Sequence, residues 1–446
     1  ELEPELLPPL AALLEVEDAG DTWAQIDPQQ RARRMLDALR RLIVRESVDR
    51  PVTIILEDLH WIDPDTQVAL EHLIDVVPTA RILFVVAYRP EYHPGWSGKS
   101  FYTQLRLDSL PDLAAGELLD DLLGVAPDIA PLKPQLLAWT EGNPFFLEEA
   151  VRTLLETGGL AGAPGAYRVT GSVVVRTLPA TVEDTLAARI HRLPADVRLV
   201  LQCAATIGVE FAHAVLTSLV NLGEETLAES LRALEKAEFV YPAASAPTPA
   251  HMFKHALTHL VTYRSVSPER QRMLHAQVLR SLETLHSGQL EVQVEALAEH
   301  AFRAELWESA AGYLQAAGTR ALARSANRTS VDHLERAIVA LDQVERRRDV
   351  LDRAIDIRLD LRYALTLLGQ YERVLPRLRE AEALALELND TVRQGRVVSF
   401  LANGLYVLGD HAGAITAARR ATEIAQLLDD FPTRMTADIY AARALH

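Results

Sequence analysis

Two acidic residues, Glu57 and Asp58, directly follow the β-branched and aliphatic segment 52–56. Such a segment is typical of a parallel strand buried on both faces, and open α/β sheets bind ligands at the carboxyl ends of their strands. One carboxylate there can help to place Mg²⁺ against a triphosphate, because Mg²⁺ takes oxygen ligands and keeps several waters. The second can orient an attacking water. On its own, however, the pair favours the simpler interpretation that two acids leave a strand for solvent.

Arg89 follows the next apolar run, residues 82–87. Between the two runs, Asp63 and Pro64 are typical of a helix N-cap and the first helical position. Strand, helix and strand with short links predict a parallel βαβ unit. Arg89 is therefore expected at the same sheet edge as the two acids, where an arginine can contact a γ-phosphate. A surface arginine after a strand is the ordinary alternative.

Gly98, Lys99 and Ser100 match only the end of a phosphate-binding loop. The motif G-x-x-x-x-G-K-[ST] needs a glycine at position 93, where this chain has His93. It also needs a helix directly afterwards, whose N-terminus binds phosphate, whereas residues 101–107 predict a short strand. The phosphate loop is not expected here.

Helical patterns dominate the rest of the chain. Three short helices are predicted at 112–123, 131–140 and 144–156. Residues 179–240 predict three more, followed by a hairpin with strands at 239–241 and 250–253. Helices followed by a hairpin in this order indicate a winged-helix domain.

The C-terminal part contains an internal repeat. From about residue 265 onward every pattern is that of an amphipathic helix. The segment that begins Leu368-Gly369 matches the one that begins Leu408-Gly409, at an offset of 40. Small residues at fixed places let paired helices pack closely, as in tetratricopeptide repeats, although the usual period of that repeat is ~34.

Bulk properties limit the function classes. A chain of 446 residues is too long for one core. Its formal net charge of −17 argues against a nucleic-acid surface over the whole chain. Cys203 is the only cysteine, which fits a reducing compartment. No apolar run approaches a membrane span. The first residue is Glu1 rather than Met, which we interpret as a sign of a fragment.

Taken together, the motifs resemble the signal-transducing ATPases with numerous domains, which belong to the wider AAA-type P-loop proteins. The group most similar is the bacterial one in which the ATPase follows a class III adenylate/guanylate cyclase domain or a protein kinase. The matching segments span about residues 50–330 in the family's order and read "EDLHWIDPDT", "AYRPE", "TEGNPFFLEEAV", "LPATVEDTLAARIHRLP", "CAATIGVEF", "FKHALTHLVTY" and "AGTRALARSAN". The resemblance implies a switch governed by ATP, ADP and Mg²⁺.

The resemblance also implies roles for the residues around the first strand. Glu57 matches the magnesium-side acid of the Walker B strand, and Asp58 matches the water-activating acid. Arg89 matches the sensor arginine. In such proteins the phosphate loop lies well before the Walker B strand, so we expect it to be missing from this chain and the fragment alone to be inactive as an ATPase.

Three further roles follow from the same resemblance. Gly142 and Pro144 match the G-x-P turn of a helical lid, whose proline lies against the adenine; without that context they form an ordinary helix junction. His255 matches the winged-helix histidine that contacts the β-phosphate of ADP. A lone histidine at a helix start is otherwise structural, and here Lys254 and Ala256 replace the family's neighbouring methionine and aspartate.

The expected architecture is multidomain and mainly α. Its parts are a partial P-loop-type α/β domain (1–107), a helical lid (108–178), a winged-helix domain (179–264) and a tetratricopeptide-like α-solenoid (265–446). The expected location is the cytoplasm. The expected partners are ATP in the intact parent and a protein or small-molecule ligand on the repeats, with self-association allowed and nucleic acid or a membrane span not expected.

Two alternative functions stay open at this point. The chain can be the regulatory region of a nucleotide cyclase whose catalytic domain lies elsewhere in the parent. It can also be a winged-helix transcription regulator of related architecture. The net charge argues against the second, as does segment 181–192, which mixes both signs of charge where a basic recognition helix would be needed.

Overall fold

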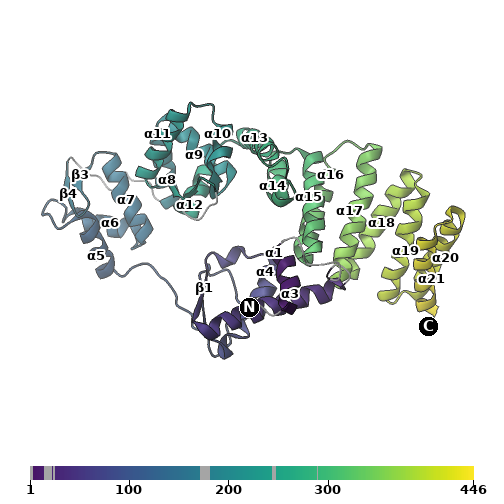
Figure 1. The fold of residues 1–446 in the computed structure, drawn as a ribbon. Helices are drawn as coiled ribbons and strands as arrows, with labels where there is room; N and C mark the ends of the chain where they lie inside the picture. Colours follow the sequence, from purple (N-terminus) through teal and green to yellow (C-terminus); the bar gives the residue numbers. More distant parts are fainter. Residues whose placement is uncertain are drawn as a thin grey trace. The chain divides into compact units, whose positions relative to one another are not determined.

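The computed structural model describes residues 4–14, 23, 26–170, 181–243, 248–288 and 290–445. The chain divides into two compact units (Figure 1): residues 1–104 with 288–446 form the first, and residues 105–287 form the second. The predicted division into four domains is finer and stays a prediction, and its boundary at residue 178 lies outside the described residues.

The first unit contains the predicted βαβ element. Strand β1 (Val52–Leu56) pairs in parallel with β2 (Ile82–Val86), and α4 (Pro64–Ile74) connects them. The side chain of Asp63 caps α4 by accepting hydrogen bonds from two backbone N–H groups of its first turn. The expected parallel strands and the cap are confirmed, but the expected burial of the strands on both faces is wrong, because every second strand residue is exposed.

The two faces of this small sheet differ. One face packs on a core that includes Leu59, Leu70 and Trp96. The other face is open, with 63% of Ile55, 57% of Leu83 and 44% of Val85 exposed. Within the described part of the chain, β1 and β2 pair only with each other. A two-stranded sheet is at best marginally stable without further packing.

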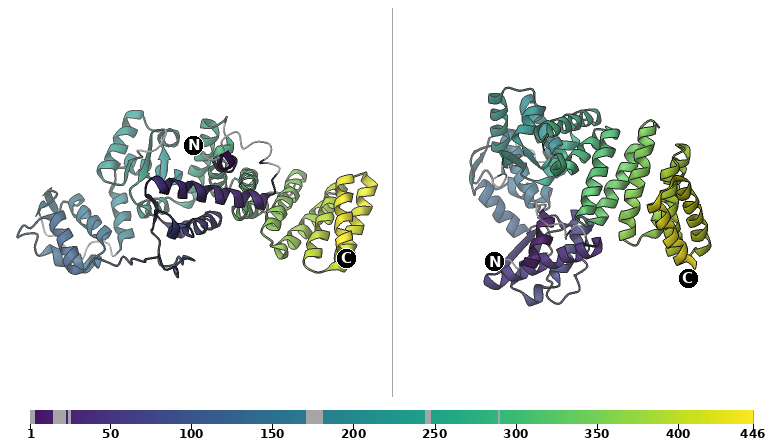
Figure 2. Two further views of the ribbon diagram at one scale, coloured as in Figure 1. Left: turned by 60° about the horizontal axis from the view of Figure 1, so that its bottom comes forward. Right: turned by 45° about the vertical axis from the view of Figure 1, so that its right-hand side comes forward.

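The described residues before β1 are mainly helical. Their helices are η1 (Pro4–Leu6), α1 (Leu7–Leu14) and the long α3 (Pro28–Asp49), which Figure 2 shows in dark purple. Leu6, Leu10 and Ala38 form the contact between these helices.

The second unit begins with helices where the periodicity predicts them. These are α5 (Asp112–Leu123), α6 (Leu132–Thr140) and α7 (Pro144–Glu156), followed by the hairpin β3 (Leu160–Ala163) and β4 (Ala166–Val169). Leu119, Leu136 and Leu147 are fully buried between the three helices.

The rest of the second unit surrounds a three-stranded antiparallel sheet in the order β5-β7-β6. The strands are β5 (Glu210–Ala212), β6 (Val240–Pro242) and β7 (Ala250–Phe253), and the helices are α8 (Val182–Arg192), α9 (Ala195–Ile207), α10 (His213–Leu219), α11 (Glu224–Lys236), α12 (Ala256–Arg264) and α13 (Pro268–Leu285). Four helices, not the predicted three, lie within residues 181–240. The one that was missed, α10, has seven residues, which is too short for a helical period to show.

The C-terminal part of the first unit is a solenoid of antiparallel helices, each packed on the next (Figures 1 and 2). In order they are η5 (Leu290–Gln293), α14 (Val294–Arg303), α15 (Trp307–Ala323), α16 (Asn327–Leu341), α17 (Arg348–Leu367), α18 (Tyr371–Glu387), α19 (Thr391–Val407), α20 (His411–Leu428) and α21 (Phe431–Leu445). The predicted fold class, mainly α with an α-solenoid at the C-terminus, is confirmed. Within the described residues, no helix combines the length and the apolar character that a membrane crossing requires.

Left-handed backbone positions explain the long repeat. Gly369, Asn389, Gly409 and Asp429 all have positive φ and recur at equal intervals, each in the turn after a helix. One repeat is two such helix-and-turn segments, hence the offset of 40 between matching positions. Small residues occupy the closest contacts: a Cβ added at Gly318 would lie 2.7 Å from the Leu334 side chain.

Candidate functional site

The acids that follow β1 and the arginine that follows β2 lie at one sheet edge. The two strands remain hydrogen-bonded beyond their ends, because Ala87 N donates to Leu56 O and Leu59 N donates to Ala87 O, both at 2.9 Å. Glu57, Asp58 and Arg89 follow these points directly and are exposed. The expectation that they share one edge of the sheet is therefore met by the backbone.

Asp58 has an unusual backbone conformation. Its φ of 53° and ψ of 37° place it in the left-handed region, which non-glycine residues enter rarely and which asparagine and aspartate tolerate best. This turn starts the short helix η2 (Leu59–Trp61) and returns Leu59 to the core. The strained position holds the carboxylate of Asp58 at the end of the strand, where strain of this kind often accompanies function.

His60 lies next to Asp58; the sequence marked it as part of the segment "EDLHWIDPDT" but assigned it no role of its own. Its Nε2 is 4.0 Å from Asp58 Oδ1, and its ring packs on Trp61 with centroids 4.7 Å apart. Both ring nitrogens are buried without a hydrogen-bond partner in the described part of the chain. Buried polar atoms are normally paired, so this ring has capacity for a bond to water, ligand or Asp58. The signal was present in the motif Asp58-Leu59-His60-Trp61.

Arg89 does not extend freely over the sheet edge. Its guanidinium carbon lies 5.9 Å from the ring centroid of Trp61, which is itself 63% exposed. A cation–π contact at an exposed site is weak, about 0.5–1 kcal/mol. Arg89 can therefore leave this position for a phosphate at small cost.

The two carboxylates fit a nucleotide-bound Mg²⁺ better than an isolated ion. No cluster of three or more His, Cys, Asp or Glu side chains with the geometry of a metal site occurs among the described residues. Mg²⁺ that accompanies a nucleotide needs only one or two carboxylates, because phosphate oxygens and waters complete its coordination. Glu57 and Asp58 meet that smaller requirement.

The segment after β2 differs from its prediction. Gly98, Lys99 and Ser100 lie in a turn, where Lys99 Nζ pairs with Asp75 Oδ1 at 2.5 Å, and no helix follows until α5. Residues 101–107 do not form the predicted strand either. Leu105 and Leu107 alternate as strand residues do, but they are 83% and 95% exposed. A strand needs a neighbour to accept its hydrogen bonds, and none lies beside this segment in the described structure.

The predicted lid turn is tightly constrained. Gly142 has a φ of 72°, and a Cβ there would lie 2.4 Å from Leu110 O. Leu110 N also donates to Gly142 O at 2.9 Å, so only glycine fits. Asn143 then caps α7 through a hydrogen bond from Phe146 N to its Oδ1, and Pro144 takes the first helical position.

His255 lies beside this turn within the second unit. It is the N-cap residue of α12, and its ring centroid is 4.5 Å from that of Phe145. Partial burial, aided by the positive charge of Lys254, lowers the pKa of His255. The ring is therefore neutral at neutral pH, with an N–H group available as a donor. The structure brings Pro144 and His255 to one region, although they lie far apart in the sequence.

A buried ion network joins α7 to α8, and the sequence analysis missed it. Arg189 is 2% exposed and its guanidinium pairs with Glu149 and with Glu156, donates to Ala237 O, and packs on the ring of Phe239 at 4.7 Å. Arg189 lies three residues after Leu186, on the buried face of α8. That position is the signal which could have identified it.

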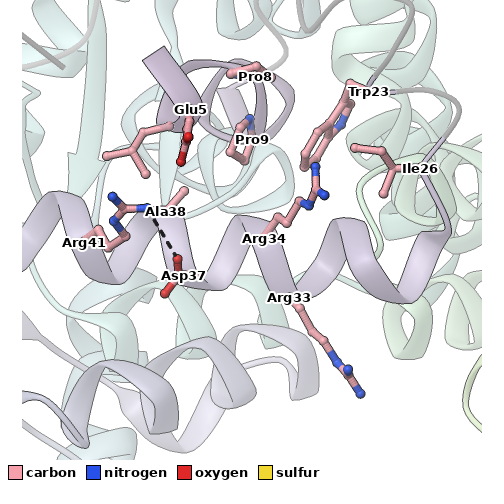
Figure 3. Close-up of a pocket in the computed structure, with 11 residues that line it drawn as sticks. Glu5, Pro8, Pro9, Trp23, Ile26, Arg33, Arg34, Asp37, Ala38 and Arg41 are labelled. Atoms are coloured by element: carbon pink, nitrogen blue, oxygen red, sulfur yellow. Dashed lines mark ion pairs between the residues drawn. The ribbon is translucent and has the colours of Figure 1, made fainter. Parts of the chain in front are cut away.

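An open pocket of about 860 Å³ lies between α1 and α3 (Figure 3). Trp23, Pro9, Arg34 and Arg41 contribute to its lining, and Arg41 forms an ion pair with Asp37 at 4.0 Å. None of the six predicted site residues lines it. Glu57, Asp58 and Arg89 belong to the first unit, whereas Gly142, Pro144 and His255 belong to the second.

Comparisons with known proteins give limited similarity. No family model matches the chain. An uncharacterized protein of Rhizobium meliloti (strain 1021) is 26% identical over 318 residues, which is 70% of this chain and 30% of that protein. The chain thus spans about a third of the length of this relative.

Two solved structures also resemble it. One is a Signal Transduction ATPase with Numerous Domains protein with a tetratricopeptide repeat sensor from Pyrococcus horikoshii, at 11% identity and a TM-score of 0.39, covering 99% of this chain and 79% of that one. The other is BtubC from P. vanneervenii, at 14% identity and a TM-score of 0.26, covering 42% and 84%. Both scores are low.

Proposed function

We propose that this chain supplies the magnesium and water side of an ATP site in a signal-transducing ATPase. Glu57 helps to hold Mg²⁺ against the triphosphate, and Asp58 orients the attacking water. Arg89 moves from Trp61 to the γ-phosphate. The observation that carries the proposal is that these three residues directly follow the carboxyl ends of two adjacent parallel strands, with Asp58 in a left-handed conformation.

The phosphate side of this site would come from outside residues 1–446. The only Gly-Lys-Ser sequence lacks the first glycine of the motif, and its lysine is paired with Asp75. Among the described residues, β1 and β2 pair only with each other, so the outer edge of each strand is open to a further strand. The exposed apolar residues Ile55, Leu83 and Val85 leave one face open to further helices. We infer that strands carrying a phosphate loop complete this sheet in the full-length protein.

The sequence resemblance also implies nucleotide contacts for two residues of the second unit. In this proposal Pro144 contacts the adenine, and the neutral ring of His255 donates a hydrogen bond to the β-phosphate of ADP. The close packing of His255 on Phe145 supports a shared role for the two segments. The repeats would bind a protein or small-molecule ligand that biases the exchange of ADP for ATP.

Such a switch controls an effector domain elsewhere in the full-length protein. A class III adenylate/guanylate cyclase domain is the candidate that the sequence resemblance favours. Residues 1–446 would then be the regulatory region of that cyclase.

Calorimetric titration with Mg-ATP tests the proposal. For this chain alone we expect no measurable hydrolysis and at best millimolar affinity, about −4 kcal/mol, because the loop amides and lysine that make most phosphate contacts are absent. The full-length protein should bind ATP far more tightly and hydrolyse it. Micromolar binding by this chain alone would contradict the division of the site, and a full-length protein that binds no nucleotide would contradict the proposed function.

A further inference from the structure

The N-terminal end of α4 touches a helix of the repeats. Asp65 Oδ2 accepts hydrogen bonds from Thr329 N at 2.8 Å and from Thr329 Oγ1 at 2.9 Å. Asp65 Oδ1 accepts a longer one from Arg328 N at 3.5 Å, and Arg328 Nη1 donates to Pro64 O at 3.3 Å. All these residues belong to the first compact unit.

Asp65 takes the place of a cap that α16 lacks. The first N–H groups of a helix have no partner inside the helix, and a side-chain oxygen of the N-cap residue usually accepts one of them. The N-cap residue of α16 is Ala326, which has no such oxygen. The first turn of α16 is therefore capped by Asp65, which is remote from it in the sequence.

The path from this cap to the acids of the candidate site is short and well held. Asp65 follows Asp58 closely along the chain. Between them, Leu59 is buried and its N–H donates to Ala87 O beside β2. Asp63 Oδ1 then accepts a hydrogen bond from Asp65 N at 3.0 Å. The burial of Leu59 and these hydrogen bonds restrain the backbone between Asp58 and Asp65.

We propose that Asp65 couples the nucleotide site to the repeats by capping α16 in one nucleotide state and releasing it in the other. This inference rests on the function proposed above and names the physical link that its regulation uses. Exchange of the nucleotide shifts Asp58 and the start of α4, and this changes the cap. The coupling is reciprocal. The factor by which the nucleotide changes the affinity for a ligand that moves α16 equals the factor by which that ligand changes the affinity for the nucleotide.

Hydrogen exchange of single amides tests the cap in this chain. In Asp65→Ala, the Thr329 amide should exchange roughly two- to thirty-fold faster, the range that corresponds to loss of one N-cap. Asp65→Asn keeps an acceptor oxygen but not the charge, so the exchange rate of its Thr329 amide should lie between those of the wild type and Asp65→Ala. The matched control is Asp75→Ala at the other end of α4, which loses the ion pair to Lys99 and should leave the Thr329 amide unchanged. If the Thr329 amide exchanges at the same rate in Asp65→Ala and in the control, the proposal that Asp65 caps α16 is refuted.

The coupling itself is tested in the full-length protein with ADP and with Mg-ATP. Exchange of the Thr329 amide should differ at least three-fold between the two nucleotide states in the wild type and not in Asp65→Ala. If both nucleotides bind but the difference is absent in the wild type, or persists in Asp65→Ala, the coupling is refuted and the proposed function stands. If the wild type binds neither nucleotide, the coupling and the proposed function are both refuted.

Discussion

Substitution of Arg189 by methionine should destabilise the second unit strongly. Arg189 is 2% exposed and Glu149 is 6% exposed, so removal of the arginine leaves a carboxylate buried without its main partner. Breaking a buried ion pair from one side costs about 3–5 kcal/mol. Glu149 keeps a weaker contact with Arg152 at 3.9 Å, and Glu156 is 31% exposed and partly hydrated. We therefore expect the lower end of that range, about 3 kcal/mol.

Native-state hydrogen exchange in graded urea measures this loss on the amides of α7 and α8, separately from the first unit. The matched control is Arg192→Met, since Arg192 lies on the same helix and pairs with the same Glu156 at 3.1 Å but is 37% exposed. This control should lose less than about 1 kcal/mol.

The double variant Arg189→Met/Glu149→Leu should recover most of the loss, because removing both partners of a buried pair is often nearly neutral. A loss below about 1 kcal/mol in Arg189→Met, or a double variant as unstable as the single one, would refute the reasoning. In either case α7 and α8 would not be held together by this network.

Three further predictions concern the site and the pH dependence. In the full-length protein, Asp58→Asn should slow ATP hydrolysis while leaving ATP binding largely intact, whereas Glu57→Gln should also weaken Mg-ATP binding; normal hydrolysis by Asp58→Asn in a steady-state assay would contradict the assigned role. His255→Ala should speed the release of a fluorescent ADP analogue in stopped flow and raise the output of the effector, whereas a purely structural histidine would lower the melting temperature and leave release unchanged. Burial lowers the pKa of His300 to about 4, so the folded state resists its protonation and stability falls as pH drops below the usual value near 6.5. Acidification from pH 7.5 to 5 should cost α14 and α15 about 2 kcal/mol, measured by hydrogen exchange, and His300→Gln should flatten this dependence.

The local parts of the fold were predictable from sequence. The runs 52–56 and 82–87 have the composition of buried parallel strands, and Asp63-Pro64 marks a helix start by its own chemistry. The placement of Glu57, Asp58 and Arg89 at one edge follows from the parallel pairing of two strands. The C-terminal repeat was visible because its helices recur at a constant interval.

Long-range side-chain contacts were not predictable in the same way. The cap of α16 by Asp65 depends on two helices that meet although they are remote in the sequence, and no local pattern records such a meeting. Residues 101–107 show the opposite failure, because their alternation is that of a strand while the neighbour they require is absent from the described structure. The contact of Arg89 with Trp61 depends on side-chain packing between two strand ends, which the sequence does not reveal.

Because the left-handed turns are evenly spaced, the solenoid can be lengthened or shortened in phase only by whole repeats. Gly369 and Gly409 occupy equivalent turns one repeat apart, so excision of the segment 370–409 would join Gly369 to Asp410 and present α20 to the turn that now precedes α18. Duplication of the same segment would add one pair of helices in phase. An insertion or deletion of ~34 residues, the period usual for tetratricopeptide repeats, would instead shift the small residues out of the helix contacts. Growth or loss of the solenoid in this chain is therefore restricted to whole repeats of its own, longer period.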